Sequence, residues 1–135
     1  MPPLNLYLAV LLGSALGGVA RFFLSGLIGS QFGEAFPWGT VLVNITGSFV
    51  IGFVAGLSAP GGRVALSPAM RLFLMTGVCG GYTTFSAFSL QTFTLLGDGH
   101  WGKAGANVVG SVGLCVLATW LGYLAAAAIN QVRTV

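Results

Sequence analysis

Four stretches of the chain are dominated by apolar residues, and short polar linkers separate them. The stretches cover residues 4–29, 38–59, 68–96 and 103–130. Each is long enough for a helix that crosses a bilayer, which needs about 20 apolar residues. They do not alternate between polar and apolar positions as the strands of a membrane barrel do. We therefore expect an all-α membrane protein, a single domain over residues 1–135 with four transmembrane helices.

The third stretch is interrupted by glycine and hydroxyl residues between Thr76 and Phe88. Backbone that leaves the helix in hydrocarbon finds no water, so a break survives only against protein, a cavity or an ion. We expect the third helix to be broken near its middle, stopping near Cys79 and restarting near Thr84. The ending helix frees carbonyl groups, which suit cations, and the restarting helix frees amides, which suit anions. The break predicts an ion site or an ion pathway.

Two other stretches carry polar stripes with a period of four residues. The stripes are Thr40, Asn44 and Ser48 in the second stretch, and Asn107, Ser111, Cys115 and Thr119 in the fourth. Residues at this spacing share one helix face. Such a stripe on its own commonly holds membrane helices together, at about 0.6 kcal/mol per hydrogen bond. Two uncharged stripes beside a broken helix favour the walls of a narrow pathway.

Phe85 and Phe88 lie one helical turn apart, just after the interruption. Pairs of this kind commonly pack in a core. Alternatively, the positive edges of the rings face an anion while their apolar bodies exclude bulk water. The residues alone leave both interpretations open.

Small residues recur at helical spacing, at Gly13 and Gly17, at Ser48, Gly52 and Gly56, and at Ala106 and Gly110. They allow helix backbones to approach closely, so they predict packing faces. Four short helices rich in glycine have little room to enclose a pore within one chain. A homodimer is the expected assembly.

The composition agrees with a membrane protein, since 56% of the residues are hydrophobic and only 5% are charged. The net charge is +3, but the basic residues are spread out, so nucleic-acid binding has no support. With four spans, Arg63, Arg71 and Arg133 lie on one side of the membrane. Lys103 lies on the other side, with Arg21 if it reaches the end of its helix. This bias is weak, so we expect insertion in both orientations.

The titratable residues argue against an enzyme and against proton coupling. Glu34, Asp98 and His100 all fall in linkers, and no nucleophile with a nearby base forms a catalytic group. The main alternative, a small dual-topology exporter driven by protons, needs a carboxylate within the membrane that this sequence lacks. A second alternative is a non-conducting assembly subunit, in which the stripes serve only as helix contacts.

Three motifs, taken together, resemble those of the Fluc (CrcB) fluoride channels, which are small four-helix membrane proteins of microorganisms. They are Gly17-Gly18-x-x-Arg21, Gly39-Thr40-x-x-Val43-Asn44 and Gly80-Gly81-Tyr82-Thr83-Thr84-Phe85-Ser86-Ala87-Phe88. They occur in the family's order and spacing, and the match covers essentially the whole chain. The third motif is highly specific, whereas the other two are not specific alone.

The resemblance implies an antiparallel dual-topology homodimer in the cell membrane, with two fluoride pores and a sodium ion buried at the centre of the interface. The backbone carbonyls of Gly80 and Thr83 from both subunits would bind this sodium, which would be structural. The implied activity is passive export of fluoride, which lowers its concentration in the cytoplasm. The implied partners are fluoride, a second copy of the chain and membrane lipid.

The resemblance also implies which residues line the anion pathway. They are Phe85, Phe88, Asn44, Thr40, Ser86, Ser111 and Arg21, with Arg21 in or near a vestibule. Two positions depart from the family pattern. Gln91 stands where many members carry a glutamate, and Asn107 stands where a pore tyrosine is expected, so the details of the route are expected to differ.

Overall fold

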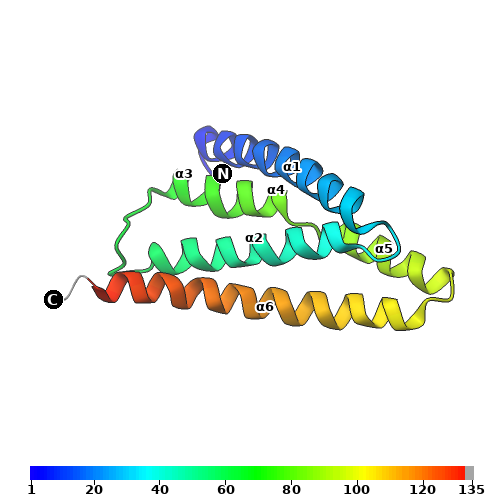
Figure 1. Cartoon of the computed structure of the whole chain (residues 1–135). Helices are drawn as coiled ribbons and strands as arrows, with labels where there is room; N and C mark the ends of the chain where they lie inside the picture. Colours follow the sequence, from blue (N-terminus) through cyan, green and yellow to red (C-terminus); the bar gives the residue numbers. More distant parts are fainter. Residues whose placement is uncertain (133–135) are drawn as a thin grey trace.

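The computed structural model describes residues 1–132, and the regular structure in that range is helical (Figure 1). The three long helices are α1 (Leu4–Phe32), α2 (Trp38–Leu57) and α6 (Trp101–Gln131). Between α2 and α6 lie α3 (Pro68–Arg71), the π-helix η1 (Leu72–Cys79), α4 (Gly80–Tyr82) and α5 (Phe85–Gly97). The expected all-α architecture with four helical segments is confirmed. Arg133, which entered the expected charge bias, lies outside the described residues.

Most helix ends lie within a few residues of those expected, and local chemistry explains two of them. α1 continues past residue 29 and ends before Gly33, whose φ of 76° is a conformation that glycine adopts readily. The third segment begins where expected because the Ser67 hydroxyl accepts a hydrogen bond from the Met70 amide (3.2 Å). Pro68 follows at the first helical position, where a missing N–H costs nothing.

Three of the helices, α1, α2 and α6, are long and apolar enough to cross a membrane. The third segment is divided, and its second part, α5, has 13 residues, or about 20 Å of helix. This is less than the roughly 30 Å of the hydrocarbon core, so the parts on both sides of the break are needed to cross it. Outward side chains such as Phe22, which is 85% exposed, suit lipid and not water. The chain is a membrane protein.

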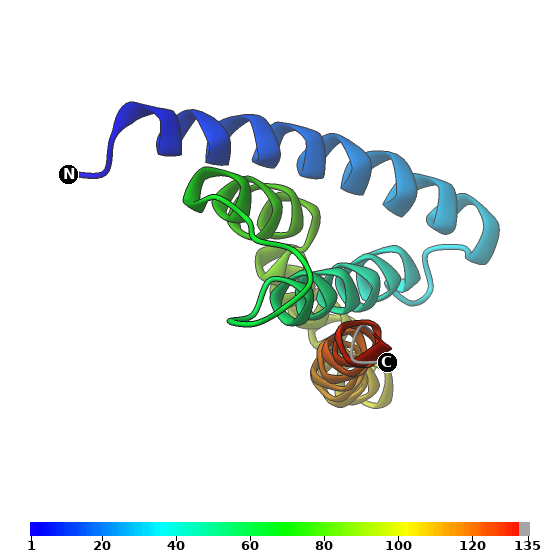
Figure 2. The same cartoon turned by 90° about the vertical axis from the view of Figure 1, so that its left-hand side faces the viewer.

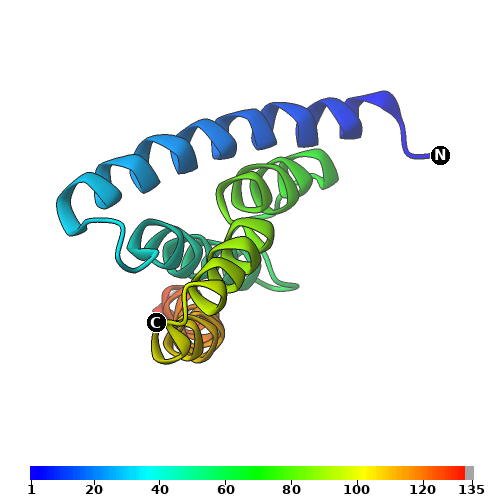
Figure 3. The ribbon, with the colours of Figure 1, turned by 90° about the vertical axis from the view of Figure 1, so that its right-hand side faces the viewer.

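The helices are arranged in layers around the third segment. α2 and α6 lie side by side along most of their length (Figure 1). Figure 2 shows α1 running across the segment formed by α3, η1 and α4, with α2 and then α6 beyond it. In Figure 3, α5 continues from the break towards the start of α6, on which it packs. The break is therefore the point at which the third segment passes from α1 to α6.

Glycines permit two of these close helix contacts. A Cβ atom at Gly52 of α2 would collide with the Thr119 carbonyl of α6, and one at Gly17 of α1 would lie 2.7 Å from the Tyr82 amide. The packing expected at these glycines is confirmed. The pair Ala106 and Gly110 behaves differently, because Ala106 is exposed and Gly110 has no atom within 4 Å of such a Cβ. Within one chain this pair forms no packing face.

Candidate functional site

The break consists of two extended residues, Thr83 and Thr84. The expected stop near Cys79 is wrong, because the helix continues to Tyr82. The Cys79 carbonyl accepts from both the Thr83 amide (3.0 Å) and the Thr83 hydroxyl (2.9 Å), and these bonds extend the last turn. The restart near Thr84 is confirmed. The Thr84 hydroxyl caps α5 by accepting from the Ala87 amide (3.2 Å).

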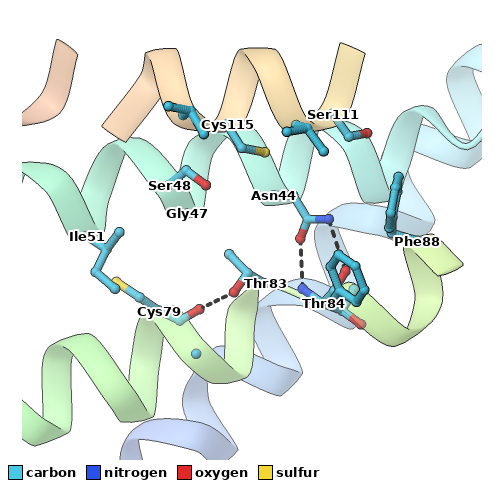
Figure 4. A pocket seen from close by; sticks show the side chains of 14 residues that line it. Asn44, Gly47, Ser48, Ile51, Cys79, Thr83, Thr84, Phe88, Ser111 and Cys115 are labelled. Atoms are coloured by element: carbon cyan, nitrogen blue, oxygen red, sulfur yellow. Dashed lines mark hydrogen bonds between the residues drawn. The ribbon is translucent and has the colours of Figure 1, made fainter. Parts of the chain in front are cut away.

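Asn44 of α2 binds the backbone freed at the break. The Thr84 amide would donate to the Gly80 carbonyl if the helix continued, but it donates to Asn44 Oδ1 (2.7 Å). The Asn44 Nδ2 group donates in return to the Thr84 carbonyl (3.0 Å), as Figure 4 shows. The Asn44 side chain thus supplies the hydrogen bonds that backbone partners would give to Thr84 in regular secondary structure. The Gly80 carbonyl is left without its usual helical donor.

Arg21 of α1 binds the other side of the break. Its Nε–H donates to the Gly81 carbonyl (3.1 Å), which belongs to the last turn of α4. A basic side chain near a helix C-terminus interacts favourably with the carbonyl dipoles gathered there. Two side chains from two different helices therefore fix the ends of the interruption.

A cavity of about 310 Å³, which we call the central cavity, lies beside the break (Figure 4). It brings together six of the residues expected for the sodium site and the anion pathway, namely Gly80, Thr83, Phe85, Phe88, Asn44 and Ser111. The other lining residues are Gly47, Ser48, Ile51, Cys79, Thr84, Val112, Cys115 and Val116. The described lining contains no charged side chain. A pathway here would offer only uncharged polar groups, namely carbonyl, hydroxyl, amide, thiol and ring-edge groups.

The two phenylalanines differ in their surroundings. Phe88 is buried, with 8% of its surface exposed, whereas Phe85 is 76% exposed. Their ring centroids lie 5.3 Å apart and the rings are tilted by 50°. Phe88 therefore contributes to packing within the chain. Phe85 has an unpacked face that can meet an ion or a second chain.

The remaining expected pathway residues lie outside the central cavity. Arg21 and Thr40 line a second cavity of about 620 Å³, which we call the lateral cavity, on the side of α5 that faces α1. Thr84 lines both cavities, so both border the break. Ser86 is exposed, and its hydroxyl lies 3.3 Å from the Thr84 hydroxyl.

The Gln91 side chain also lines the lateral cavity, and its Oε1 atom is buried. This oxygen has no hydrogen-bond partner among the described residues. Gln91, where the resemblance implies a glutamate in many members, therefore places an uncommitted amide at the cavity wall.

Asn107 finds its hydrogen-bond partners within the chain. It is 1% exposed, and its Nδ2 donates to the Thr92 hydroxyl of α5 (2.9 Å). Ser111 donates to Asn107 Oδ1 (3.2 Å), so the Ser111 proton is directed along α6. Thr92 was not among the expected site residues, although its place one turn after Phe88 on α5 was a usable signal. This network joins α5 to α6 and fixes the wall that carries Ser111.

Ser48 is the lining residue whose hydroxyl stays uncommitted. Several serines and threonines in these helices donate to a carbonyl four residues earlier, as Thr92 does to Phe88 (2.8 Å) and Thr119 to Cys115 (3.0 Å). The Ser48 hydroxyl makes no hydrogen bond within residues 1–132 and points into the central cavity (Figure 4). It can donate to a bound anion without giving up another contact.

Comparison with known proteins identifies relatives along the whole molecule. Residues 8–123 match the family model described as CrcB-like protein, Camphor Resistance (CrcB). A relative from Opitutus terrae is 58% identical over 130 residues, which cover 96% of this chain and 98% of the relative. One from Methylocella silvestris is 52% identical over 127 residues, with coverages of 94% and 97%. One from Rhodospirillum rubrum is 54% identical over 125 residues, with coverages of 93% and 97%.

All three relatives are named fluoride-specific ion channel FluC. These names confirm the expectation that the chain is not an enzyme. The family match covers most of the chain, and the relatives align along nearly their full length. The chain therefore belongs to the CrcB-like family, as the motifs of its first three helical segments indicated.

Proposed function

We propose that this chain forms a channel that lets fluoride leave the cell passively and so lowers fluoride in the cytoplasm. The names of the relatives support fluoride as the ion. The observation that carries the proposal is the uncharged central cavity, in which Asn44, Phe85 and the break meet. Fluoride is small and strongly hydrated, so it needs replacement donors in a constriction, and a fixed positive charge would hold it too tightly to leave.

The proton-coupled alternative gains no support from the positions of the acids. Glu34 lies in the exposed linker between α1 and α2, and Asp98 lies just after α5 and is also exposed. Neither lines the central cavity, and Glu34, which lines the lateral cavity with Arg21 and Thr40, stays in the exposed linker. A carrier driven by protons needs a carboxylate that titrates along its route. The second alternative, a non-conducting subunit, has no specific observation in its favour.

We propose that the working unit is an antiparallel homodimer with two pores. The exposed face of Phe85 and the exposed Gly80 backbone border the central cavity, so one chain leaves it open on that side. The unused small-residue pair at Ala106 and Gly110 offers a face for close approach of another helix. A second copy in the opposite orientation would close the cavity, and the weak charge bias permits both orientations.

We propose that a structural sodium ion binds the carbonyls of Gly80 and Thr83 from both copies. The Gly80 carbonyl has lost its helical donor to Asn44, and Thr83 is extended with ψ of 162°. Both residues line the central cavity, and a Cβ built at Gly80 would make only an ordinary van der Waals contact, 3.8 Å from the Met75 carbonyl oxygen. Unwound carbonyls of this type bind sodium in other membrane proteins. The ion would lock the two breaks together.

Fluoride efflux from liposomes that contain the purified protein tests the proposal. An ion-selective electrode follows fluoride, a matched experiment follows chloride, and protein-free liposomes give the background. We expect rapid fluoride efflux, little chloride efflux and weaker activity when a large organic cation replaces sodium. Absence of fluoride efflux above background would reject the channel. Efflux that is unaffected by sodium would reject the structural ion alone.

A further inference from the structure

Arg21 is placed by a close backbone contact of α1 with the end of η1 and with α4. Gly17 lies one helical turn before Arg21, and a Cβ there would collide with the Val78 carbonyl and lie 2.7 Å from the Tyr82 amide. A Cβ at Gly81 would lie 2.6 Å from the Ser14 carbonyl. The two backbones therefore touch, and the next turn of α1 carries Arg21 past the end of α4. Its Nε–H meets the Gly81 carbonyl at 3.1 Å.

The Gly81 carbonyl needs a donor because its helix ends. Its helical donor would be the amide of Phe85, which already belongs to the next helix, α5. Arg21 supplies the donor from outside the third segment. A bond between a charged donor and a carbonyl is stronger than one between neutral groups, so it can hold the orientation of this peptide.

The orientation of Gly81 determines where the Gly80 carbonyl points. Successive residues of a helix are turned by about 100° around its axis, so neighbouring peptides face different sides. Gly81 faces α1, whereas Gly80 lines the central cavity. Planar peptides share only two soft dihedral angles per residue, so fixing one peptide restricts the next.

We propose that Arg21 is a positioning residue that holds the Gly81 peptide and thereby keeps the Gly80 carbonyl aimed at the sodium site. This inference rests on the proposed function. It differs from a role in which the arginine charge attracts fluoride from the lateral cavity, which its side chain also lines. The positioning role needs a donor at the Nε atom, and the attracting role needs a positive charge.

Three substitutions separate these roles. Arg21→Gln places an amide nitrogen the same number of bonds from the backbone as Nε, so it keeps the donor and removes the charge. Arg21→Met keeps the length of the side chain and removes both. Arg21→Lys keeps the charge but carries no N–H at the Nε position. Arg71→Met, at an exposed position of α3, is the matched control for loss of an arginine.

The sodium dependence of fluoride efflux is the readout, with dimer content checked by crosslinking. We expect Arg21→Met to raise the sodium concentration for half-maximal flux about tenfold or more, as loss of a charge-assisted hydrogen bond implies. The sodium concentration for half-maximal flux in Arg21→Gln should stay close to that of the unmodified chain. It should be lower in Arg21→Gln than in Arg21→Lys. A lower half-maximal sodium concentration in Arg21→Lys than in Arg21→Gln would overturn the inference. An unchanged half-maximal sodium concentration in Arg21→Met would also overturn it.

A second measurement separates this inference from the channel itself. Sodium that binds only the folded dimer raises its melting temperature. The rise should be smaller in Arg21→Met than in Arg21→Gln, whether or not fluoride flows. If the unmodified chain conducts no fluoride, the proposed function fails and this comparison still decides the role of Arg21. If Arg21→Met does not fold, the order of the Gln and Lys variants decides it.

Discussion

Single side chains hold the unwound residues at membrane depth. Asn44 satisfies both the amide and the carbonyl of Thr84, and the Thr84 hydroxyl caps α5. Hydrocarbon supplies no other partner for such groups, so each contact offsets a desolvation cost. Asn44 keeps one further N–H on its amide group, which can face an anion in the central cavity. The residue that stabilises the break can therefore also take part in conduction.

Replacing Asn44 by Ala should reduce both stability and fluoride flux. Loss of two hydrogen bonds to Thr84 leaves half-buried backbone groups unpaired, at about 1–3 kcal/mol each. Asn130→Ala is the matched control, because Asn130 also clamps backbone by two bonds, to Gly56 and Arg63, far from the central cavity. Thermal unfolding in detergent should show a loss for both variants, and flux measurements a loss for Asn44→Ala only. Equal flux in the two variants would contradict a role for Asn44 in the site.

Replacing Phe85 or Phe88 by Ile should suppress fluoride flux, since either change removes an aromatic edge from the cavity wall. The two variants should differ in stability. Phe88 is buried, so Phe88→Ile should cost about 1 kcal/mol, whereas Phe85→Ile should leave the fold unchanged. Phe93→Ile, at a position 73% exposed and outside the central cavity, is the control. Undiminished flux in Phe85→Ile would show that the Phe85 ring serves packing and has no role in conduction.

At the scale of elements, the glycine and hydroxyl residues predicted that the third segment breaks and where it restarts, but not where its first part ends. The helix reaches Tyr82 because the Thr83 hydroxyl and amide both bond to the Cys79 carbonyl, a local geometry that composition does not encode. The π-helical turns of η1 could not be predicted either, because the apolar residues from Leu72 to Cys79 do not distinguish a π-helix from an α-helix. The partner of Asn44 lies 40 positions away, and only the packing of α2 against the break reveals it.

Helix packing depends on glycines that accept no side chain. Gly52→Ala should destabilise the protein by about 1–3 kcal/mol, because the added methyl group meets the backbone of Thr119, which cannot move aside. Gly26→Ala is the control, since a Cβ there meets nothing within 4 Å. It should be neutral or stabilise the helix by about 0.5–1 kcal/mol. Thermal unfolding compares the two, and equal melting temperatures would show that α2 and α6 can separate without cost.

At the scale of the whole molecule, the arrangement leaves the site incomplete in one chain. The break joins two helix layers, Phe85 presents an open ring face, and one face of α6 around Gly110 is unpacked within the described residues. A second copy in the opposite orientation would cover these features. The same chain would then have to insert both ways in comparable amounts.

Labelling from outside the cell tests this dual topology. Ser30 lies exposed at the end of α1, so Ser30→Cys should react with a membrane-impermeant maleimide in about half of the molecules, because the charge bias is weak. The unmodified chain gives the background, since Cys79 and Cys115 lie within the helices. A double variant that combines Ser30→Cys with Lys103→Gln lacks one basic residue on the side of the membrane that carries position 30. Basic residues favour the cytoplasm, so the labelled fraction should rise above that of Ser30→Cys alone. Labelling of all or none of the Ser30→Cys molecules would require a single orientation and exclude the antiparallel dimer.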